Sequence, residues 1–361
     1  MSNLSDLLPS GGGQNIVDFT ASGTVASGKP VVLNTNGTVS QIALTSTSKG
    51  SVNTWQSGAY SSASMVYDVN AGKSVIFYRD SNNSNYGTAA VVSVSGTTVS
   101  VGTPVVFLSS NIYNGIMGDS ATYDSNAQKV VYAFLDFGDS TRTKSIVGTV
   151  SGTSISFGSA TSLETENTDS SCKLAFDSTL NKVIAVYRNA SQSGRGEARV
   201  GTVSGTSCSW ESGTVFQSSN IQYPSVAYDP VADRCLITYQ SQGAHSSKGA
   251  AVVASNNGTQ LSYGTTSFFS GTDSVSLNAI VYDSVQKAMV IAYKSGSDDS
   301  GNVVAGTISG DAITFGTASQ VETGTYTLVQ GAFDASANKC VFVYRDGDNS
   351  NYTTLTIATV S

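Results

Sequence analysis

Short apolar runs alternate with polar turns along most of the chain, and the turns are rich in Gly, Ser, Thr and Asn. The run at 130–134 is apolar at every position, which is typical of a β-strand that is covered on both faces. The run at 198–203 leads through a Ser-Gly pair into another short strand-like segment, as expected for a tight β-hairpin. No segment has the apolar spacing of an amphipathic helix. The pattern predicts an all-β protein.

A repeat of 51 to 56 residues organises these strands. An aromatic-Asp pair occurs six times, and another aromatic residue follows each Asp after ten positions. The Asp residues are Asp68, Asp124, Asp177, Asp229, Asp283 and Asp334, and the later aromatic residues are Tyr78, Phe134, Tyr187, Tyr239, Tyr293 and Tyr344. Each unit contains four expected strands, so the repeat predicts a six-bladed β-propeller of four-stranded blades. Because the Asp begins a short turn in every unit, we expect it to accept hydrogen bonds from its own turn.

The two ends of the chain are predicted to meet in the last blade. The sixth unit ends after its third strand, whereas residues 38–44, which follow an Asn-Gly pair, resemble an isolated fourth strand. Pairing of 38–44 with the third strand of the last blade would close the ring and remove an exposed sheet edge. We therefore expect the propeller to span 38–361 and residues 1–37 to form a short N-terminal β arm for attachment.

Charge and composition narrow the range of partners. The chain has 18 Lys and Arg against 25 Asp and Glu and no basic cluster, so no nucleic-acid partner is expected. It has no apolar stretch of membrane-spanning length and no signal-peptide pattern, so we expect synthesis in a cytoplasm and no membrane insertion. The four cysteines lie far apart in apolar segments, which predicts buried thiols, and no metal or cofactor is expected.

Catalytic motifs are scarce, and we expect no catalytic residues. The chain has one histidine, His245, in a Gly- and Ser-rich loop, and it has no phosphate-binding loop and no nucleophile elbow. A sialidase-like carbohydrate-active enzyme is an alternative, because such enzymes bind a carboxylate with arginines from several blades. Their Ser-x-Asp-x-Gly-x-x-Thr-Trp motif does not occur here, and the sequence reveals no convincing Tyr and Glu pair for the nucleophile. These absences favour a non-enzymatic protein.

The connections between the second and third strands are long, polar and varied, whereas those between the first and second strands are short and uniform. On a propeller these variable loops share one face, and such variation is typical of a binding surface on a rigid scaffold. The first and sixth units both contain Tyr-Arg-Asp followed by Asn-Ser-Asn-Tyr, residue types that can hydrogen-bond to a sugar and stack on it. The candidate glycan-binding residues are Arg79, Asp80, Tyr86, Arg188, Asn189, Arg345, Asp346 and Tyr352.

Two other interpretations of these loops are open. The pairs Arg79–Asp80 and Arg345–Asp346 could serve only to order their own loops. Residues 346–351 resemble part of a calcium-binding loop, but the later bidentate Glu of an EF-hand is missing.

The N-terminal segment carries a family resemblance. Residues 1–9, MSNLSDLLP, and residues 21–39, ASGTVASGKPVVLNTNGTV, resemble the opening of virion structural proteins of tailed phages of marine bacteria, cyanophages in particular. The resemblance covers roughly the first 45 residues, and the repeat beyond them is similar in general character to fibre and decoration proteins of those particles. It implies a non-enzymatic virion protein, a capsid decoration or a tail fibre, that is made in the host cytoplasm.

The resemblance also implies partners. The arm at 1–37 is expected to bind other virion proteins, and the propeller is expected to display its loop face to a glycan or receptor on the host surface. A free-standing lectin and a carbohydrate-active enzyme are the alternatives.

Overall fold

The computed structural model describes residues 20–21, 31–33, 38–41, 60–96, 98–113, 120–168 and 172–360. The chain divides into two units, residues 1–50 and 51–361, which are described in turn. In the first unit, strands β1 (Val31–Leu33) and β2 (Val39–Gln41) pair antiparallel.

Strand β2 falls within the segment that is predicted to complete the last blade. It pairs with β1, to which it is joined by a short connection, so this pairing needs little loop closure. Residues 42–44 lie outside the described residues. Closure of the ring by 38–44 therefore stays a prediction.

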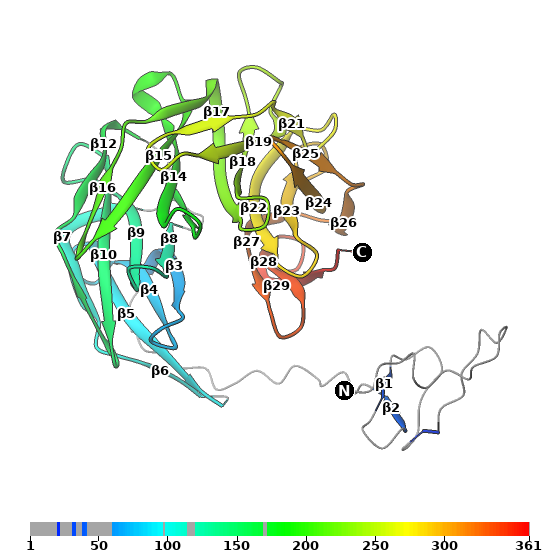
Figure 1. The fold of residues 1–361 in the computed structure, drawn as a ribbon, viewed down its shortest axis with the longest axis horizontal. Helices are drawn as coiled ribbons and strands as arrows, with labels where there is room; N and C mark the ends of the chain where they lie inside the picture. The colour runs from blue at the N-terminus through cyan, green and yellow to red at the C-terminus, as the bar shows by residue number, and fades with distance from the viewer. Residues whose placement is uncertain are drawn as a thin grey trace. The chain divides into compact units, whose positions relative to one another are not determined.

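Six antiparallel meanders follow one another in the described part of the second unit (Figure 1). The first comprises β3 (Tyr60–Asp68), β4 (Lys73–Asp80), β5 (Tyr86–Ser95), β6 (Thr98–Val101) and β7 (Val105–Tyr113). The second comprises β8 (Ala121–Asp124), β9 (Lys129–Asp136), β10 (Arg142–Ser151), β11 (Ser154–Phe157) and β12 (Thr161–Asn167). The third comprises β13 (Lys173–Asp177), β14 (Lys182–Asn189), β15 (Arg195–Ser204), β16 (Ser207–Trp210) and the first part of β17 (Thr214–Asp229).

The remaining meanders repeat this order. The fourth comprises the second part of β17, β18 (Arg234–Ser241), β19 (Lys248–Asn256), β20 (Leu261–Tyr263) and β21 (Ser267–Phe268). The fifth comprises β22 (Val275–Asp283), β23 (Ala288–Ser295), β24 (Gly301–Ser309), β25 (Ala312–Phe315) and β26 (Ser319–Glu322). The sixth comprises β27 (Tyr326–Asp334), β28 (Lys339–Asp346) and β29 (Tyr352–Ala358). Among the described residues, no helix is long and apolar enough to cross a membrane.

The first strands of the meanders lie side by side around a common axis, in the order β3, β8, β13, β17, β22 and β27. Each meander runs outward from there through its second and third strands, as the blades of a propeller do (Figure 1). In the first five meanders, two short strands in succession pair with the third strand and form the outer edge. The prediction of an all-β propeller fold is confirmed, and the division of the outer strand is an addition to it.

A glycine marks this division in the second meander. The amide of Gly158 donates to the carbonyl of Val147 at 3.1 Å, which holds the chain on the third strand between β11 and β12. A Cβ at Gly158 would lie 2.0 Å from the carbonyl oxygen of Thr206 in the next meander, so only glycine allows this close approach. At the corresponding Gly316, the nearest atom to such a Cβ is 3.7 Å away, because the sixth meander has no outer strand among the described residues.

The hydrophobic core lies between neighbouring meanders. Phe77 of the first meander and Tyr132 of the second are fully buried, and their rings stack with centroids 4.4 Å apart. Phe157, at the end of β11, reaches back to Phe107 of the first meander at 5.5 Å. Full burial of such a side chain stabilises the fold by about 1.5–3 kcal/mol. The apolar second strands therefore hold adjacent blades together.

The repeated Asp has the structural role that the sequence predicts. Asp124 Oδ1 accepts hydrogen bonds from the amides of Asn126 (2.9 Å) and Ala127 (2.8 Å). The same two bonds occur at Asp177, Asp229, Asp283 and Asp334. The prediction is confirmed, and this turn fixes where each second strand begins.

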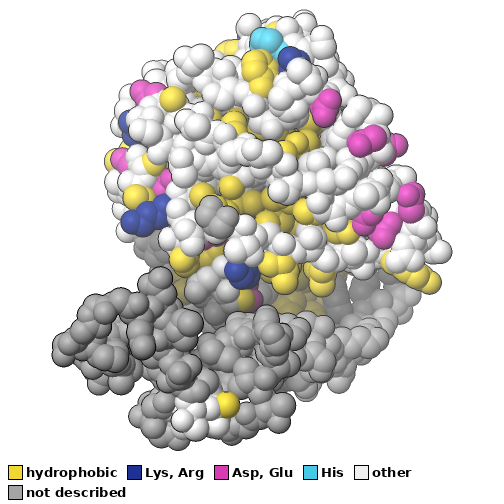
Figure 2. Space-filling view, turned by 90° about the vertical axis from the view of Figure 1, so that its right-hand side faces the viewer, with side chains coloured by type: hydrophobic (Ala, Val, Ile, Leu, Met, Phe, Trp, Pro, Cys, Tyr) yellow, Lys and Arg dark blue, Asp and Glu magenta, His cyan; other side chains and the backbone are white. Residues whose placement is uncertain are grey.

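The sixth meander leaves an apolar groove at the edge of the sheet. Leu355 and Ile357 on its last strand are 66% and 62% exposed. A groove of about 410 Å³ lies between β24 and β29 and is lined mainly by Val, Ala and Ile side chains. Figure 2 shows apolar side chains in a band across the side of the propeller that lies to the right in Figure 1. Between the first and second meanders, the outer strand fills the corresponding space with Phe157.

Candidate functional site

The loops between the second and third strands are tied to the segments beside them. The amide of Phe137 donates to the carbonyl of Asn111 at 2.9 Å, and the amide of Gly243 donates to the carbonyl of Asn220 at 3.1 Å. In each case the partner lies on the segment that enters the same meander from the previous one. These bonds order the loop face, which is the surface formed by these six loops.

Two predicted ligand residues hold their own loops in shape. Asp80 is 8% exposed, and its Oδ1 accepts a hydrogen bond from the amide of Asn82 at 3.0 Å. Asp346 is 9% exposed, and its Oδ1 accepts from the amides of Asp348 and Asn349, both at 3.1 Å. Each carboxylate therefore lies under its loop and stabilises it.

Two predicted arginines make the same contact in different meanders. Arg79 Nε donates to Asn111 Oδ1, and Arg188 Nε donates to Asn220 Oδ1, both at 3.1 Å. Each asparagine belongs to a Ser-Ser-Asn-Ile sequence that enters the next meander. The Arg–Asn pair thus links two neighbouring blades at the loop face.

The remaining predicted residues lie in the first and sixth meanders. Arg345 Nε donates to Thr327 Oγ1 at 3.0 Å on the neighbouring strand. Tyr352 is 63% exposed at the start of β29, and Tyr86 is half-buried at the start of β5. Each tyrosine pairs in register with the Asp of its own loop, so each loop gathers its Arg, Asp and Tyr.

The first and sixth meanders face each other across a cavity. The cavity has a volume of about 400 Å³ and is lined by Met65 and Tyr67 on one side and by Val341 and Val343 on the other. Arg188 lies on the third meander, so the predicted residues form separate groups rather than one cluster.

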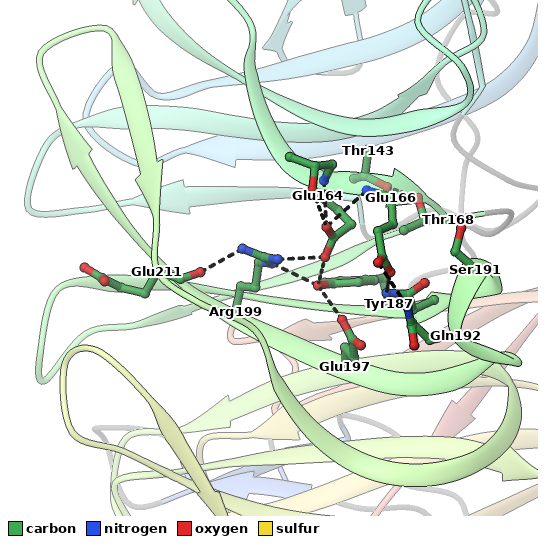
Figure 3. Close-up of polar contacts among 12 residues, drawn as sticks. Thr143, Glu164, Glu166, Thr168, Tyr187, Ser191, Gln192, Glu197, Arg199 and Glu211 are labelled. Carbon is green, nitrogen blue, oxygen red and sulfur yellow. Dashed lines mark hydrogen bonds and ion pairs between the residues drawn. The ribbon is translucent and has the colours of Figure 1, made fainter.

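A buried network of charged groups joins the second and third meanders (Figure 3). The Tyr187 hydroxyl lies 2.7 Å from Glu164 Oε2 and 3.0 Å from Glu197 Oε2. Arg199 Nη2 donates to Glu164 Oε2 at 2.7 Å, and Arg199 Nε donates to the Tyr187 oxygen at 2.9 Å. Arg195 pairs with Glu197. Each carboxylate has one guanidinium partner, so the charges balance.

Burial decides the protonation states in this network. It raises the pKa of the Tyr187 phenol far above its ordinary value, so the phenol is neutral and donates its proton. Burial also opposes ionisation of Glu164, but hydrogen bonds from Tyr187 and Arg199 outweigh it and lower the pKa of Glu164. The arrangement is an ion pair with a neutral tyrosine between its charges.

The tyrosine contact recurs at other blade junctions. Glu322 Oε2 accepts from the Tyr344 hydroxyl at 2.9 Å, and Gln217 Nε2 donates to the Tyr239 hydroxyl at 3.4 Å. In each case the outer strand of one meander reaches the second strand of the next. Tyr187 itself is 0% exposed. Recurrence and burial both indicate that the contact ties blades together, and the sequence analysis missed it because the partners belong to different repeat units.

Polar side chains near this network form two hydrogen-bonded groups, which together we call the polar belt. It consists of Glu166, Asn189 and Gln192 in one group and of Arg188, Asn220 and Gln242 in the other. Glu166 accepts from Asn189 Nδ2 at 2.9 Å and from Gln192 Nε2 at 3.0 Å. Asn220 Nδ2 donates to Gln242 Oε1 at 2.7 Å. The first group lies between the second and third meanders and the second group between the third and fourth. Asn189 itself is 1% exposed, whereas the other members are at least partly exposed and present amide, carboxylate and guanidinium groups.

His245 lies on the same face. Its Nδ1 is 3.0 Å from Ser241 Oγ, and its ring packs against Phe268 at 4.8 Å. The described residues contain no group of three or more His, Cys, Asp or Glu side chains placed to hold a metal ion. The four cysteines are buried, as predicted, and burial raises the pKa of Cys208 to about 12.

Comparison with known proteins shows similarity of fold. No family model matches the chain, and no curated protein matches it in sequence. A protein from Lactobacillus plantarum is 12% identical with a TM-score of 0.54, over 94% of this chain and 93% of that one. The intramolecular trans-sialidase from Ruminococcus gnavus, solved with oseltamivir carboxylate, is 9% identical with a TM-score of 0.51, over 84% and 95%. A protein of unknown function from Dyadobacter fermentans is 9% identical with a TM-score of 0.52, over 82% and 93%.

Proposed function

We propose that this chain is a non-enzymatic glycan-binding propeller of a tailed-phage particle. In this proposal the loop face contacts a glycan or receptor on the host surface, and the arm at 1–37 binds other virion proteins. The observation that carries the glycan proposal is the polar belt. The side chains within each of its two groups are hydrogen-bonded to one another, so little side-chain entropy is lost when they bind a sugar.

The chemistry of the loop face suits sugars better than other partners. Planar amides, guanidinium groups and carboxylates offer paired donors and acceptors to vicinal hydroxyls. The chain has a net charge of −7 and lacks a basic cluster, which disfavours nucleic acid as the ligand.

A sialidase-like enzyme is the alternative that the fold comparison raises, and the trans-sialidase from Ruminococcus gnavus has that activity. The candidate nucleophile would be Tyr187, because among the described residues it is the tyrosine whose hydroxyl contacts two carboxylates. Its complete burial and raised pKa argue against attack on a substrate. We therefore favour binding without turnover.

A glycan array tests the binding proposal. The wild-type chain is expected to bind a defined set of glycans, and the triple variant R79A/R188A/R345A is expected to lose at least about tenfold in affinity. The matched control is K129A/K182A/K339A. These three lysines occupy the same position in three repeat units, at turns on the opposite face, so the control removes the same number of positive charges. Thermal unfolding of both variants checks that they fold. A wild-type chain that binds no glycan, or equal binding by both variants, would overturn the proposal.

Mass spectrometry of purified phage particles tests the virion part separately. Peptides of this chain are expected in the particles at a stoichiometry of a structural component. Their absence from particles, with glycan binding intact, would favour a free-standing lectin.

A further inference from the structure

Two aromatic side chains form an exposed stack on the loop face of the second meander. The rings of Tyr113 and Phe137 have centroids 5.8 Å apart and an interplanar angle of 13°. Phe137 is 44% exposed. The corresponding first loop positions of the other five meanders are Ser81, Ala190, Gln242, Gly296 and Gly347. The second meander is therefore the one that places an aromatic ring there.

The loop that carries Phe137 is held rigidly. Its amide donates to the carbonyl of Asn111, and the amide of Gly138 donates to Asp136 Oδ1 at 3.0 Å. Ser110 Oγ donates to the same Asp136 oxygen. These hydrogen bonds hold the backbone around Phe137, while the ring of Phe137 stays accessible to a ligand.

Charged groups on the same hairpin are paired with one another. Asp139 lies 3.0 Å from Arg142 and 2.9 Å from Lys144, and Lys144 also lies 2.9 Å from Asp136. Two carboxylates thus face two cations, and the cluster has no excess charge. The Arg142 and Asp139 side chains are 42% and 36% exposed, and Asp139 lies in the same loop, two residues after Phe137.

We propose that Tyr113 and Phe137 form a stacking subsite for a neutral pyranose ring. This inference rests on the proposed glycan function and assigns the sugar class and its place. The weakly positive C–H groups on one face of a pyranose pack against the negative face of an aromatic ring. The hydroxyls at the ring edge then meet Asp139 and Arg142, which offer an acceptor and donors. Because these charges balance, the subsite has no reason to select an anionic sugar.

Calorimetric titration of a neutral oligosaccharide into the wild-type chain and three variants tests this subsite. The probe is the neutral glycan that the wild-type chain binds best on the array. F137A is expected to lose about tenfold in affinity, whereas F137Y, which keeps the ring, is expected to bind like wild type. The matched control is Y67A, which removes an aromatic side chain that is 55% exposed at the end of β3, on the face opposite the loops, and it is expected to bind like wild type.

The outcomes separate the subsite from the wider proposal. If the wild type binds neutral glycans and F137A binds them equally well, the subsite is wrong while the glycan function stands. If the wild type binds only anionic glycans, the assigned sugar class is wrong. If the wild type binds no glycan, the proposed function fails and the subsite fails with it.

Discussion

The buried network around Tyr187 gives a quantitative prediction for Arg199. The substitution Arg199→Met keeps the length of the side chain and removes its charge and donors. Glu164, which is 4% exposed, would lose its guanidinium partner at 2.7 Å and remain in a site without solvent. An uncompensated buried charge costs about 3–5 kcal/mol. Because the Arg199 side chain is 21% exposed, we expect the lower end, about 3 kcal/mol.

The same variant has a predicted pH dependence. In the wild type, the pKa of Glu164 is lowered, so its contribution to stability is present above the unfolded pKa of about 4.3 and is lost as pH falls through the folded pKa. Without Arg199, burial raises that pKa above the unfolded value, and protonation then favours the folded state. The difference in unfolding free energy between wild type and variant should therefore shrink between pH 7 and about pH 4.

Urea unfolding followed by circular dichroism at several pH values measures both effects. The control is Arg142→Met, because Arg142 pairs with Asp139 at 3.0 Å but its side chain is 42% exposed, so its loss should cost at most about 1 kcal/mol. The double variant E164Q/R199M should recover part of the loss. Equal costs for Arg199→Met and Arg142→Met, or a cost that does not change with pH, would refute the reasoning.

Two further predictions concern the blades. Asp229→Ala removes the acceptor for the amides of Val231 (2.8 Å) and Ala232 (3.0 Å), and chemical denaturation should show a loss of about 1–3 kcal/mol, whereas a loss below measurement error would contradict the role of the repeated Asp. If residues 38–44 complete the last blade, a chain that begins at residue 45 should unfold at a lower temperature than one that begins at residue 34. Equal unfolding temperatures for these two chains would count against ring closure by this segment.

Local signals made most of the fold predictable. The apolar second strands, the Asp that caps its own turn and the interval of 51 to 56 residues depend on neighbours in sequence. The repeat predicted the propeller, and the structure confirms it. The division of the outer strand at Gly158 was not predictable, because it depends on the Thr206 carbonyl of the next meander.

The loop face was predictable as a surface but not in its contacts. Variation among the loops indicated the face, and the residue types suggested sugar binding. The partners of Arg79 and Arg188 could not be predicted, because each asparagine lies 32 positions further along, on the segment that enters the next blade. The stack of Tyr113 and Phe137 could not be predicted for the same reason. Tyr113 lies at the end of β7, which leads into the second meander, whereas Phe137 lies in the loop after β9.

Hydrogen exchange on the full chain, with and without a bound oligosaccharide, tests the central claim most directly. The account predicts that added protection is confined to the loops between second and third strands, above all residues 136–142 and 188–195. Protection confined to the opposite turns, such as residues 124–129 and 229–234, or no change at saturating ligand, would contradict the assignment of the loop face as the glycan-binding surface.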